Sequence, residues 1–304
     1  MCATCGCEGE VKASVLNLQT GHAAAPSHEH DHNVPIGQGD PHEHVHADGT
    51  RHSHPHELRE HEHGHGGETI TIEQRILAKN DALAAKTRAW LSGREILALN
   101  LVSSPGAGKT TLLERSIAGL ASEFPLFVIE GDQATAKDGE RIRAAGAPVV
   151  QVNTGTGCHL DAEMVARGLR ELKPGSGAVL FIENVGNLVC PALFDLGERA
   201  KVVIFSVTEG EDKPLKYPHM FRAAELVIFN KIDLLPYVDF SMAQALSNLR
   251  EVNADATTFE LSARTGEGLN DWFGWIRRQA ALARQFAFLE TDPLSRRGNI
   301  TPRS

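Results

Sequence analysis

Short apolar runs alternate with amphipathic stretches along residues 96–286. The apolar runs cover residues 96–104, 125–132, 148–154, 178–184, 201–207, 226–233 and 256–263, and a closing helix is predicted over 267–286. Strands that are apolar on both faces, with helices between them, indicate an α/β fold with a doubly wound, mostly parallel sheet. Ligands of such a sheet bind beyond the carboxyl ends of its strands.

A helix is predicted ahead of this series, over residues 71–92. Thr71 and Gln74 form a capping-box pair at its start, and Gly93 follows its end. Its apolar positions are expected on roughly one face: Ile72, Ile76, Leu83 and Trp90. This helix opens the globular part of the chain.

The segment from His22 to His65 has few apolar residues and no lasting periodicity. Thirteen of the 15 histidines lie between His22 and His65, among Gly, Pro, Glu and Asp. Such a segment cannot bury enough apolar surface to offset chain entropy, so a disordered tail is expected. The predicted organisation is a metal-binding tail over 1–68, a nucleotide-binding domain over 69–290 and a flexible end over 291–304.

Composition narrows the classes of protein that fit. A formal net charge of −9 argues against a nucleic-acid partner. No apolar run is long enough to cross a bilayer, and no apolar signal region follows Met1, so a cytoplasmic protein without membrane insertion is expected. Cys2, Cys5 and Cys7 are three of only five cysteines, and clustered thiols in the cytosol indicate metal ligands or redox groups.

The stretch SSPGAGKTT, residues 103–111, predicts a phosphate-binding loop. It follows G-x-x-x-x-G-K-[ST] except that Ser103 replaces the first glycine. Glycines let backbone N–H groups turn toward phosphates at a helix N-terminus, a lysine reaches the β- and γ-phosphates, and a hydroxyl binds Mg²⁺. An ordinary strand–turn–helix corner is the weaker alternative. The predicted nucleotide-binding residues are Gly106, Ala107, Gly108, Lys109, Thr110 and Thr111.

The bound base is predicted from FNKID, which ends the sixth apolar run. Asn230, Lys231 and Asp233 match N-K-x-D, and Asp233 can accept hydrogen bonds from both donors on the edge of guanine. Ser262 and Ala263 in LSARTG are expected beside the base carbonyl. GTP is therefore the predicted nucleotide.

Carboxylates at two strand ends are candidates for holding Mg²⁺ and sensing the γ-phosphate. Glu183 and Gly186 occupy the place of D-x-x-G in ENVGN, and Asp132 ends the second apolar run. Lys109, Asp132 and Glu183 are the predicted catalytic residues, with Thr110, Asp132 and Glu183 around Mg²⁺. The alternative, that Glu130, Asp132 and Asp138 are solvated acids, stays open.

Cys158, His159 and Cys190 are a candidate metal site. All three follow predicted strands, on the nucleotide side of the sheet. Two thiolates and an imidazole suit Zn²⁺ or Ni²⁺. A packed cysteine beside a surface histidine is the alternative.

Taken together, CATCGC at the start, the His-rich insert, SSPGAGKTT, GTGCHLDA, ENVGNLVCP and NKID resemble the HypB family of metallochaperone GTPases, of the SIMIBI class of P-loop proteins. The resemblance implies a GTPase that helps insert nickel into the [NiFe]-hydrogenase large subunit. It implies a HypA-type accessory protein and the hydrogenase large-subunit precursor as partners, and a homodimer formed through the internal metal face. It also implies tight nickel binding by Cys2, Cys5 and Cys7, and a second nickel or zinc site at Cys158, His159 and Cys190.

The terminal cysteines have a chemistry of their own. If Met1 is removed, the amine and sulfur of Cys2 with the thiolates of Cys5 and Cys7 give one nitrogen and three sulfur ligands, a set that suits square-planar Ni²⁺. Zn²⁺ competes for the same thiolates. Two other hypotheses remain: a metal-storage protein based on the histidine tract, and a related metallochaperone for urease, against which the terminal cysteine motif argues.

Overall fold

The computed structural model describes residues 14–21, 23–24, 42–45, 51–54, 72–132, 137–155 and 157–291. The chain divides into two units, one formed by 1–26 with 72–304 and the other by 27–71. Within the described ranges, no helix is long and apolar enough to cross a membrane.

The first unit is built on one nine-stranded sheet among the described residues, with strand order β11-β10-β9-β5-β8-β6-β7-β1-β2. The seven strands from β11 to β7 are parallel, and β1 and β2 are antiparallel additions at one edge. The bounds are β1 Ser14–Asn17, β2 Ala23–Ala24, β5 Leu97–Ser103, β6 Leu126–Asp132, β7 Val149–Asn153, β8 Val179–Glu183, β9 Ala200–Ser206, β10 Leu226–Asn230 and β11 Thr257–Glu260. The predicted doubly wound α/β sheet is confirmed.

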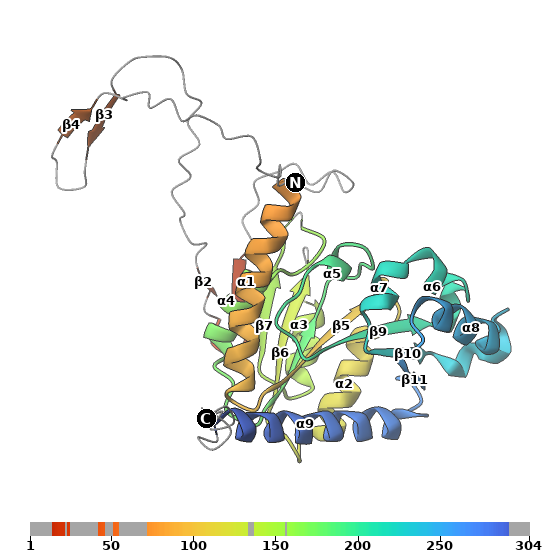
Figure 1. Cartoon of the computed structure of the whole chain (residues 1–304). Helices are drawn as coiled ribbons and strands as arrows, with labels where there is room; N and C mark the ends of the chain where they lie inside the picture. The colour runs from red at the N-terminus through yellow and green to blue at the C-terminus, as the bar shows by residue number, and fades with distance from the viewer. Residues whose placement is uncertain are drawn as a thin grey trace, which may run out of the picture. The chain divides into compact units, whose positions relative to one another are not determined.

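Helices cover both faces of the sheet (Figure 1). One face packs against α2 (Lys109–Leu120), α3 (Lys137–Ala144) and α9 (Leu269–Thr291). The other packs against α1 (Ile72–Ser92) and α4 (Ala162–Leu172) and, farther along, α5 (Cys190–Leu193), α7 (Pro218–Ala223) and α8 (Met242–Val252). In β5, Leu97 and Leu99 belong to the first core and Ala98 to the second, because successive side chains of a strand point to opposite faces. Short turns complete the fold: η1 (Val207–Glu209), α6 (Lys213–Lys216) and η2 (Ile232–Tyr237).

Helix α1 forms over the predicted range, but its inward face differs from the prediction. Ile76 is 41% exposed, whereas the buried positions are Asn80, Ala84, Thr87 and Leu91. Asn80 is inside because its amide donates to the Asp195 carbonyl at 2.8 Å and accepts from the Ala162 N–H at 2.9 Å. A satisfied polar residue therefore fixes the helix where an apolar one was expected. Thr71 lies outside the described residues.

The predicted tail contributes to the sheet. β1 pairs with β7 in the register Ser14↔Asn153 and Asn17↔Val150, and Val15 is fully buried. Assigning residues 14–17 to a disordered tail was therefore wrong. The physical reason is the free edge of β7, whose backbone groups β1 satisfies while Val15 joins the core beside α1 and α4.

The second unit contains an antiparallel pair of strands, β3 (His42–Val45) and β4 (Arg51–His54). Its register sets His42 opposite His54 and His44 opposite His52. Disorder was the wrong expectation for these eight residues. A hairpin signal is present in the sequence, since His-x-His alternation flanks Asp48-Gly49. The rest of the histidine tract, and residues 292–304, lie outside the described residues.

Candidate nucleotide and metal site

The loop between β5 and α2 has a backbone that only glycine adopts readily at two positions. Gly106 has φ 75° and Gly108 has φ 94°. A Cβ at Gly108 would lie 2.5 Å from Nδ2 of Asn230. Helix α2 begins at Lys109, so its free N–H groups face the loop, which suits an anion. Ser103, in place of the usual first glycine, is buried, and its hydroxyl donates to the Ser104 carbonyl at 2.8 Å.

Asn230 and Lys231 hold this loop from the end of β10. The buried Asn230 amide donates to the Ala107 carbonyl at 2.8 Å and accepts from the N–H groups of Lys231 and Ala263 at 2.8 and 3.0 Å. Lys231 Nζ donates to the Gly106 carbonyl at 2.6 Å. The N-K pair thus joins two segments more than a hundred residues apart in sequence.

Asp233 and Ser262 meet at the side of the same loop. Ser262 Oγ donates to Asp233 Oδ1 at 2.6 Å and accepts from the Thr265 N–H at 3.1 Å. The next residue, Ala263, is the one whose N–H reaches Asn230. The structure therefore gathers all five predicted base-binding residues at the ends of β10 and β11.

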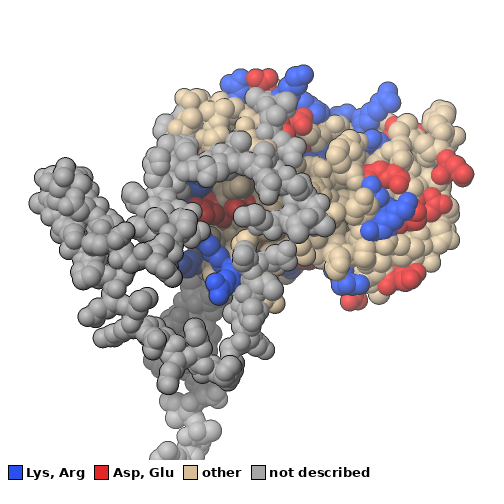
Figure 2. All heavy atoms as spheres, turned by 90° about the horizontal axis from the view of Figure 1, so that it is seen from above, with Lys and Arg blue, Asp and Glu red and all other residues tan. Residues whose placement is uncertain are grey.

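A carboxylate pair lies on the other side of the loop. Thr110 Oγ1 donates to Glu183 Oε1 at 2.7 Å, and Lys109 Nζ is 3.4 Å from the same oxygen. Glu130 of β6 is the register partner of Glu183 on β8, and both side chains are about 2% exposed. Figure 2 views the molecule from above, and acidic and basic side chains of described residues are visible beside one another there.

Glu130 is not a solvated acid. Burial, reinforced by the Glu183 carboxylate, raises the pKa of Glu130 to about 9. Asp132 follows on the same strand, half-buried, whereas the Asp138 carboxylate pairs with exposed Arg141 at 3.0 Å. The interpretation as a solvated acid is therefore wrong for Glu130, whereas it agrees with the partly exposed side chain of Asp138.

The acidic cluster fits a divalent cation. Oε2 of Glu130 and Oε2 of Glu183 are buried and have no hydrogen-bond partner among the described residues. A buried carboxylate oxygen without a donor is costly, and a cation such as Mg²⁺, which binds oxygen ligands, relieves that cost. Thr110 supplies a neutral oxygen beside them.

Sequence reasoning missed Asn184 and Asn187, which organise the segment after β8. Asn184 Oδ1 accepts from the Leu160 N–H at 3.1 Å, and Asn187 Nδ2 donates to the Cys158 carbonyl at 3.3 Å. A Cβ at Gly186 would lie 3.2 Å from atoms of Pro105. This segment therefore contacts both the phosphate loop and the Cys158 loop. Two asparagines in six residues at a strand end were the available signal.

Cys158, His159 and Cys190 come together as predicted from their strand-end positions. The sulfur atoms are 2.9 Å apart, Cys158 Sγ is 3.7 Å from His159 Nδ1, and one ligand atom from each residue lies within 4.8 Å of the others. Neither cysteine forms a disulfide bond. The alternative of a surface histidine does not hold, because the His159 ring packs on Phe194 with centroids 4.0 Å apart.

The site favours a neutral imidazole. Burial lowers the pKa of His159 from its ordinary value, and Asp161 offsets part of that effect. Neutral imidazole and thiolates are the ligand forms that bind Zn²⁺ and Ni²⁺. The predicted terminal ligands Cys2, Cys5 and Cys7 lie outside the described residues.

Known proteins are similar to this chain over the region that contains these residues. The family model "CobW/HypB/UreG, nucleotide-binding domain" matches residues 97–260. The hydrogenase maturation factor HypB of Azotobacter chroococcum is 59% identical over 210 residues, which is 69% of each chain. A solved HypB from Archaeoglobus fulgidus is 37% identical with a TM-score of 0.63, covering 67% of this chain and 99% of its own. HypB from Helicobacter pylori, solved in complex with nickel, is 36% identical with a TM-score of 0.63, covering 67% of this chain and 95% of its own.

The matched region contains the phosphate loop, the carboxylate pair, the internal Cys-His cluster and N-K-I-D. The identities of its relatives exceed a third over two thirds of the chain, and the fold agrees with theirs. The chain belongs to the HypB family of hydrogenase maturation factors, within the CobW/HypB/UreG group of P-loop GTPases.

Proposed function

We propose that this protein is a cytoplasmic, GTP-hydrolysing nickel metallochaperone that helps load the [NiFe]-hydrogenase large subunit. The names of its relatives, and the nickel complex of the Helicobacter pylori protein, support this proposal. The observation that carries it is the segment from Glu183 to Cys190. One end of this segment touches Lys109 and Thr110, and the other supplies a thiol to the Cys-His cluster.

In the nucleotide half of the site, Gly106–Thr111 bind the phosphates through backbone N–H groups and the Lys109 ammonium. Bound Mg²⁺ would supply a positive charge to the β- and γ-phosphates, held by Thr110, Asp132 and Glu183. When the nucleotide binds, Lys109 exchanges its contact with Glu183 for the phosphates, which frees the carboxylate for the cation. Lys109, Asp132 and Glu183 are accordingly the proposed catalytic residues.

Asp233 supplies the preference for guanine. Its Oδ1 accepts from Ser262, which orients the carboxylate toward the base while Asn230 fixes the loop beneath. Adenine has no pair of donors for this carboxylate. Binding adenine would leave this charged acceptor without its donors from the base, which costs about 2 kcal/mol or more.

Cys158, His159 and Cys190 hold nickel, or zinc in competition with it. Gly186 rests on Pro105 of the phosphate loop, so displacement of this segment on hydrolysis also displaces Cys190 relative to Cys158. Metal–sulfur bonds tolerate only a few tenths of an ångström. A change of nucleotide would therefore alter metal affinity, and linkage requires the reverse effect as well.

The terminal cysteines and the histidine tract are proposed to supply this site. Cys2, Cys5 and Cys7 form the tight nickel site, and the histidines store further nickel or zinc. Storage has one structural support: the register sets His42 opposite His54 and His44 opposite His52 on a two-stranded ribbon. A HypA-type accessory protein and the hydrogenase precursor are the proposed partners. A homodimer in the GTP or metal state is the proposed active form.

The test uses a variant that keeps the chain length. Deleting residues 1–65 would remove β1 from the sheet, so Cys2, Cys5 and Cys7 become serine and the 13 tract histidines become asparagine. Ni²⁺ is then titrated by calorimetry with GDP and with a non-hydrolysable GTP analogue, and oligomer size is measured in parallel. We expect one site per chain with different affinities in the two states. Cys190→Ser is the control that should abolish it, and equal affinities with no change in size would refute gated transfer.

A further inference from the structure

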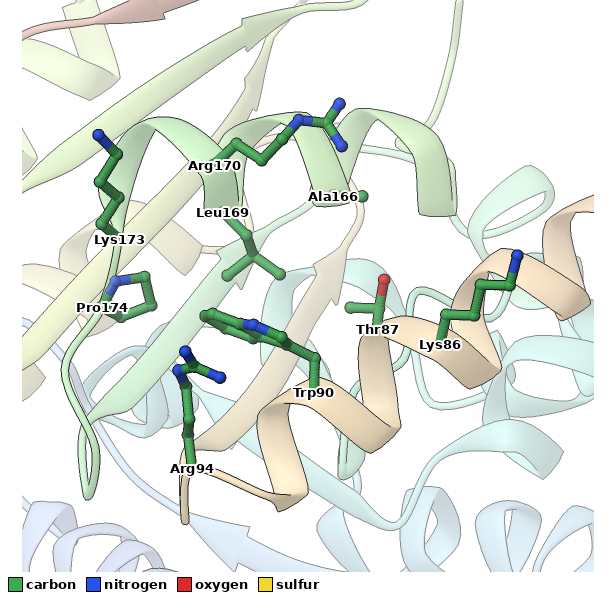
Figure 3. Close-up of a pocket in the computed structure, with 9 residues that line it drawn as sticks. All are labelled: Lys86, Thr87, Trp90, Arg94, Ala166, Leu169, Arg170, Lys173 and Pro174. Carbon is green, nitrogen blue, oxygen red and sulfur yellow. The ribbon is translucent and has the colours of Figure 1, made fainter.

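A cavity of about 510 Å³ lies between α1 and α4. It opens at the C-terminal halves of both helices, from which the chain leads into the amino ends of β5 and β8. The cavity is therefore near the amino ends of the strands, whereas the phosphate loop is at their carboxyl ends. Its lining is shown in Figure 3: Lys86, Thr87, Trp90, Arg94, Ala166, Leu169, Arg170, Lys173 and Pro174.

The rim of the cavity is cationic. Lys86 and Arg94 come from α1 and its extension, Arg170 and Lys173 from the end of α4, and no acidic residue is among the described residues that line it. None of these four side chains forms an ion pair with another described residue. Arg88, in the middle of the same stretch of α1, is by contrast paired with Asp195.

Helix electrostatics explains only part of this arrangement. Arg170 and Lys173 lie at the C-terminal end of α4, where cations offset the helix dipole. Lys86 lies in the body of α1, and Arg94 lies beyond its end at Ser92. Four like charges around one cavity repel one another, and an anion placed among them removes that repulsion.

The floor of the cavity is apolar and aromatic. In Figure 3 Leu169 lies against the Trp90 ring, with Pro174 beside the ring and Ala166 farther along α4. The Arg94 guanidinium lies over the Trp90 ring, 4.3 Å from its centroid, and covers part of it. The Trp90 side chain as a whole is only partly buried, so the rest of the indole borders the cavity. Small-molecule sites have volumes of roughly 300–1,000 Å³ and combine such a floor with a few polar groups.

We propose that this cavity binds a small organic polyanion, a planar ring system bearing at least two carboxylate or phosphate groups. The ring packs on Trp90 and Leu169, and the acidic groups reach cations at the two ends. Lys86 is six residues, about 9 Å, from the end of α1 at Ser92, and Arg94 follows two residues later, a length that matches a ligand of one or two rings. An acidic peptide would extend past this length onto surface outside the lining.

The test follows the fluorescence of Trp90 in the full-length protein saturated with GDP and Mg²⁺. The other two tryptophans, Trp272 and Trp275, are at most 4% exposed and belong to the core beneath α9, so only Trp90 reports on the cavity. The probe is benzene-1,3,5-tricarboxylate, titrated at pH 8 and two salt concentrations. We expect a saturable change that weakens with salt and vanishes in Trp90→Phe, while calorimetry still detects binding to that variant.

Substitutions then separate the effect of the lining cations from the effect of the protein's overall charge. Arg170→Ala with Lys173→Ala should weaken binding about tenfold, since two partly exposed ion contacts each contribute up to ~1 kcal/mol. Arg222→Ala with Arg250→Ala removes two exposed cations elsewhere and should change nothing. Thermal melting of each variant verifies that it folds.

Four results would each overturn the proposal. The first two are the absence of a saturable signal and an unchanged affinity in the Arg170/Lys173 variant. Another is binding of inorganic phosphate as tight as that of the tricarboxylate, because the apolar floor would then contribute nothing. The last is tighter binding of a hexaglutamate peptide, which would make the groove a peptide-docking surface.

Discussion

Asn230→Ala tests how much the N-K-I-D segment stabilises the phosphate loop. The side chain is 1% exposed and makes three hydrogen bonds, one donated to the Ala107 carbonyl and two accepted from backbone N–H groups. Alanine leaves all three backbone groups without their partner. At roughly 1 kcal/mol or more for each buried unsatisfied group, the free energy of unfolding should fall by about 3–4 kcal/mol.

Urea unfolding of the nucleotide-free protein measures this loss. With a slope of about 2 kcal/mol per molar urea, the midpoint should move down by about 1.5–2 M. The affinity for GDP should fall as well, because the loop loses its tether at Ala107.

Asn253→Ala is the matched control. Asn253 also bonds to several backbone groups, among them the carbonyls of Phe221 and Ala224 at 2.9 Å, but it lies at the end of α8. It should destabilise the fold without changing GDP affinity. A loss below about 1 kcal/mol in Asn230→Ala, or a GDP affinity no weaker than that of the control, would refute the tether.

Three further predictions concern separate parts of the site. Glu130→Gln should stabilise the metal-free protein. Because the pKa of Glu130 is raised from 4.5 to about 9 in the folded state, its contribution to stability is greatest below pH 4.5 and falls as pH rises toward 9. Removing the charge should therefore add up to about 3 kcal/mol to the free energy of unfolding at pH 7 and almost nothing at pH 4.5. Unfolding curves at the two pH values measure this, and a pH-independent difference would contradict it. Asp233→Asn should shift binding from GTP toward xanthosine triphosphate while the Ser262 contact persists, measured as the ratio of the two affinities; an unchanged ratio would remove Asp233 from the base site. Asn187→Ala should lower nickel affinity about tenfold at unchanged GTP affinity, since it releases the Cys158 carbonyl; equal nickel affinity would assign Asn187 a structural role alone.

The sequence by itself determined the elements and the chemistry of their ends. Buried runs such as 97–103 and 226–230 are apolar on both faces, which is enough to predict parallel strands, and residues after such strands must gather at one edge. For that reason the phosphate loop, the N-K-I-D segment and the Cys-His cluster were all found from spacing. Each of these signals is local.

Tertiary structure decided what depends on contacts between distant segments. The pairing of β1 with β7 needs an open sheet edge, which four residues of sequence do not reveal. The inward turn of Asn80, with Ile76 left exposed, follows from carbonyl and N–H partners more than eighty residues away. In the sequence Glu130 resembles any surface acid, but the register sets it beside Glu183 in a buried site. Burial and the identity of neighbouring side chains are properties of the folded chain. In the folded chain they raise the pKa of Glu130 to about 9, so this carboxyl group is protonated at neutral pH.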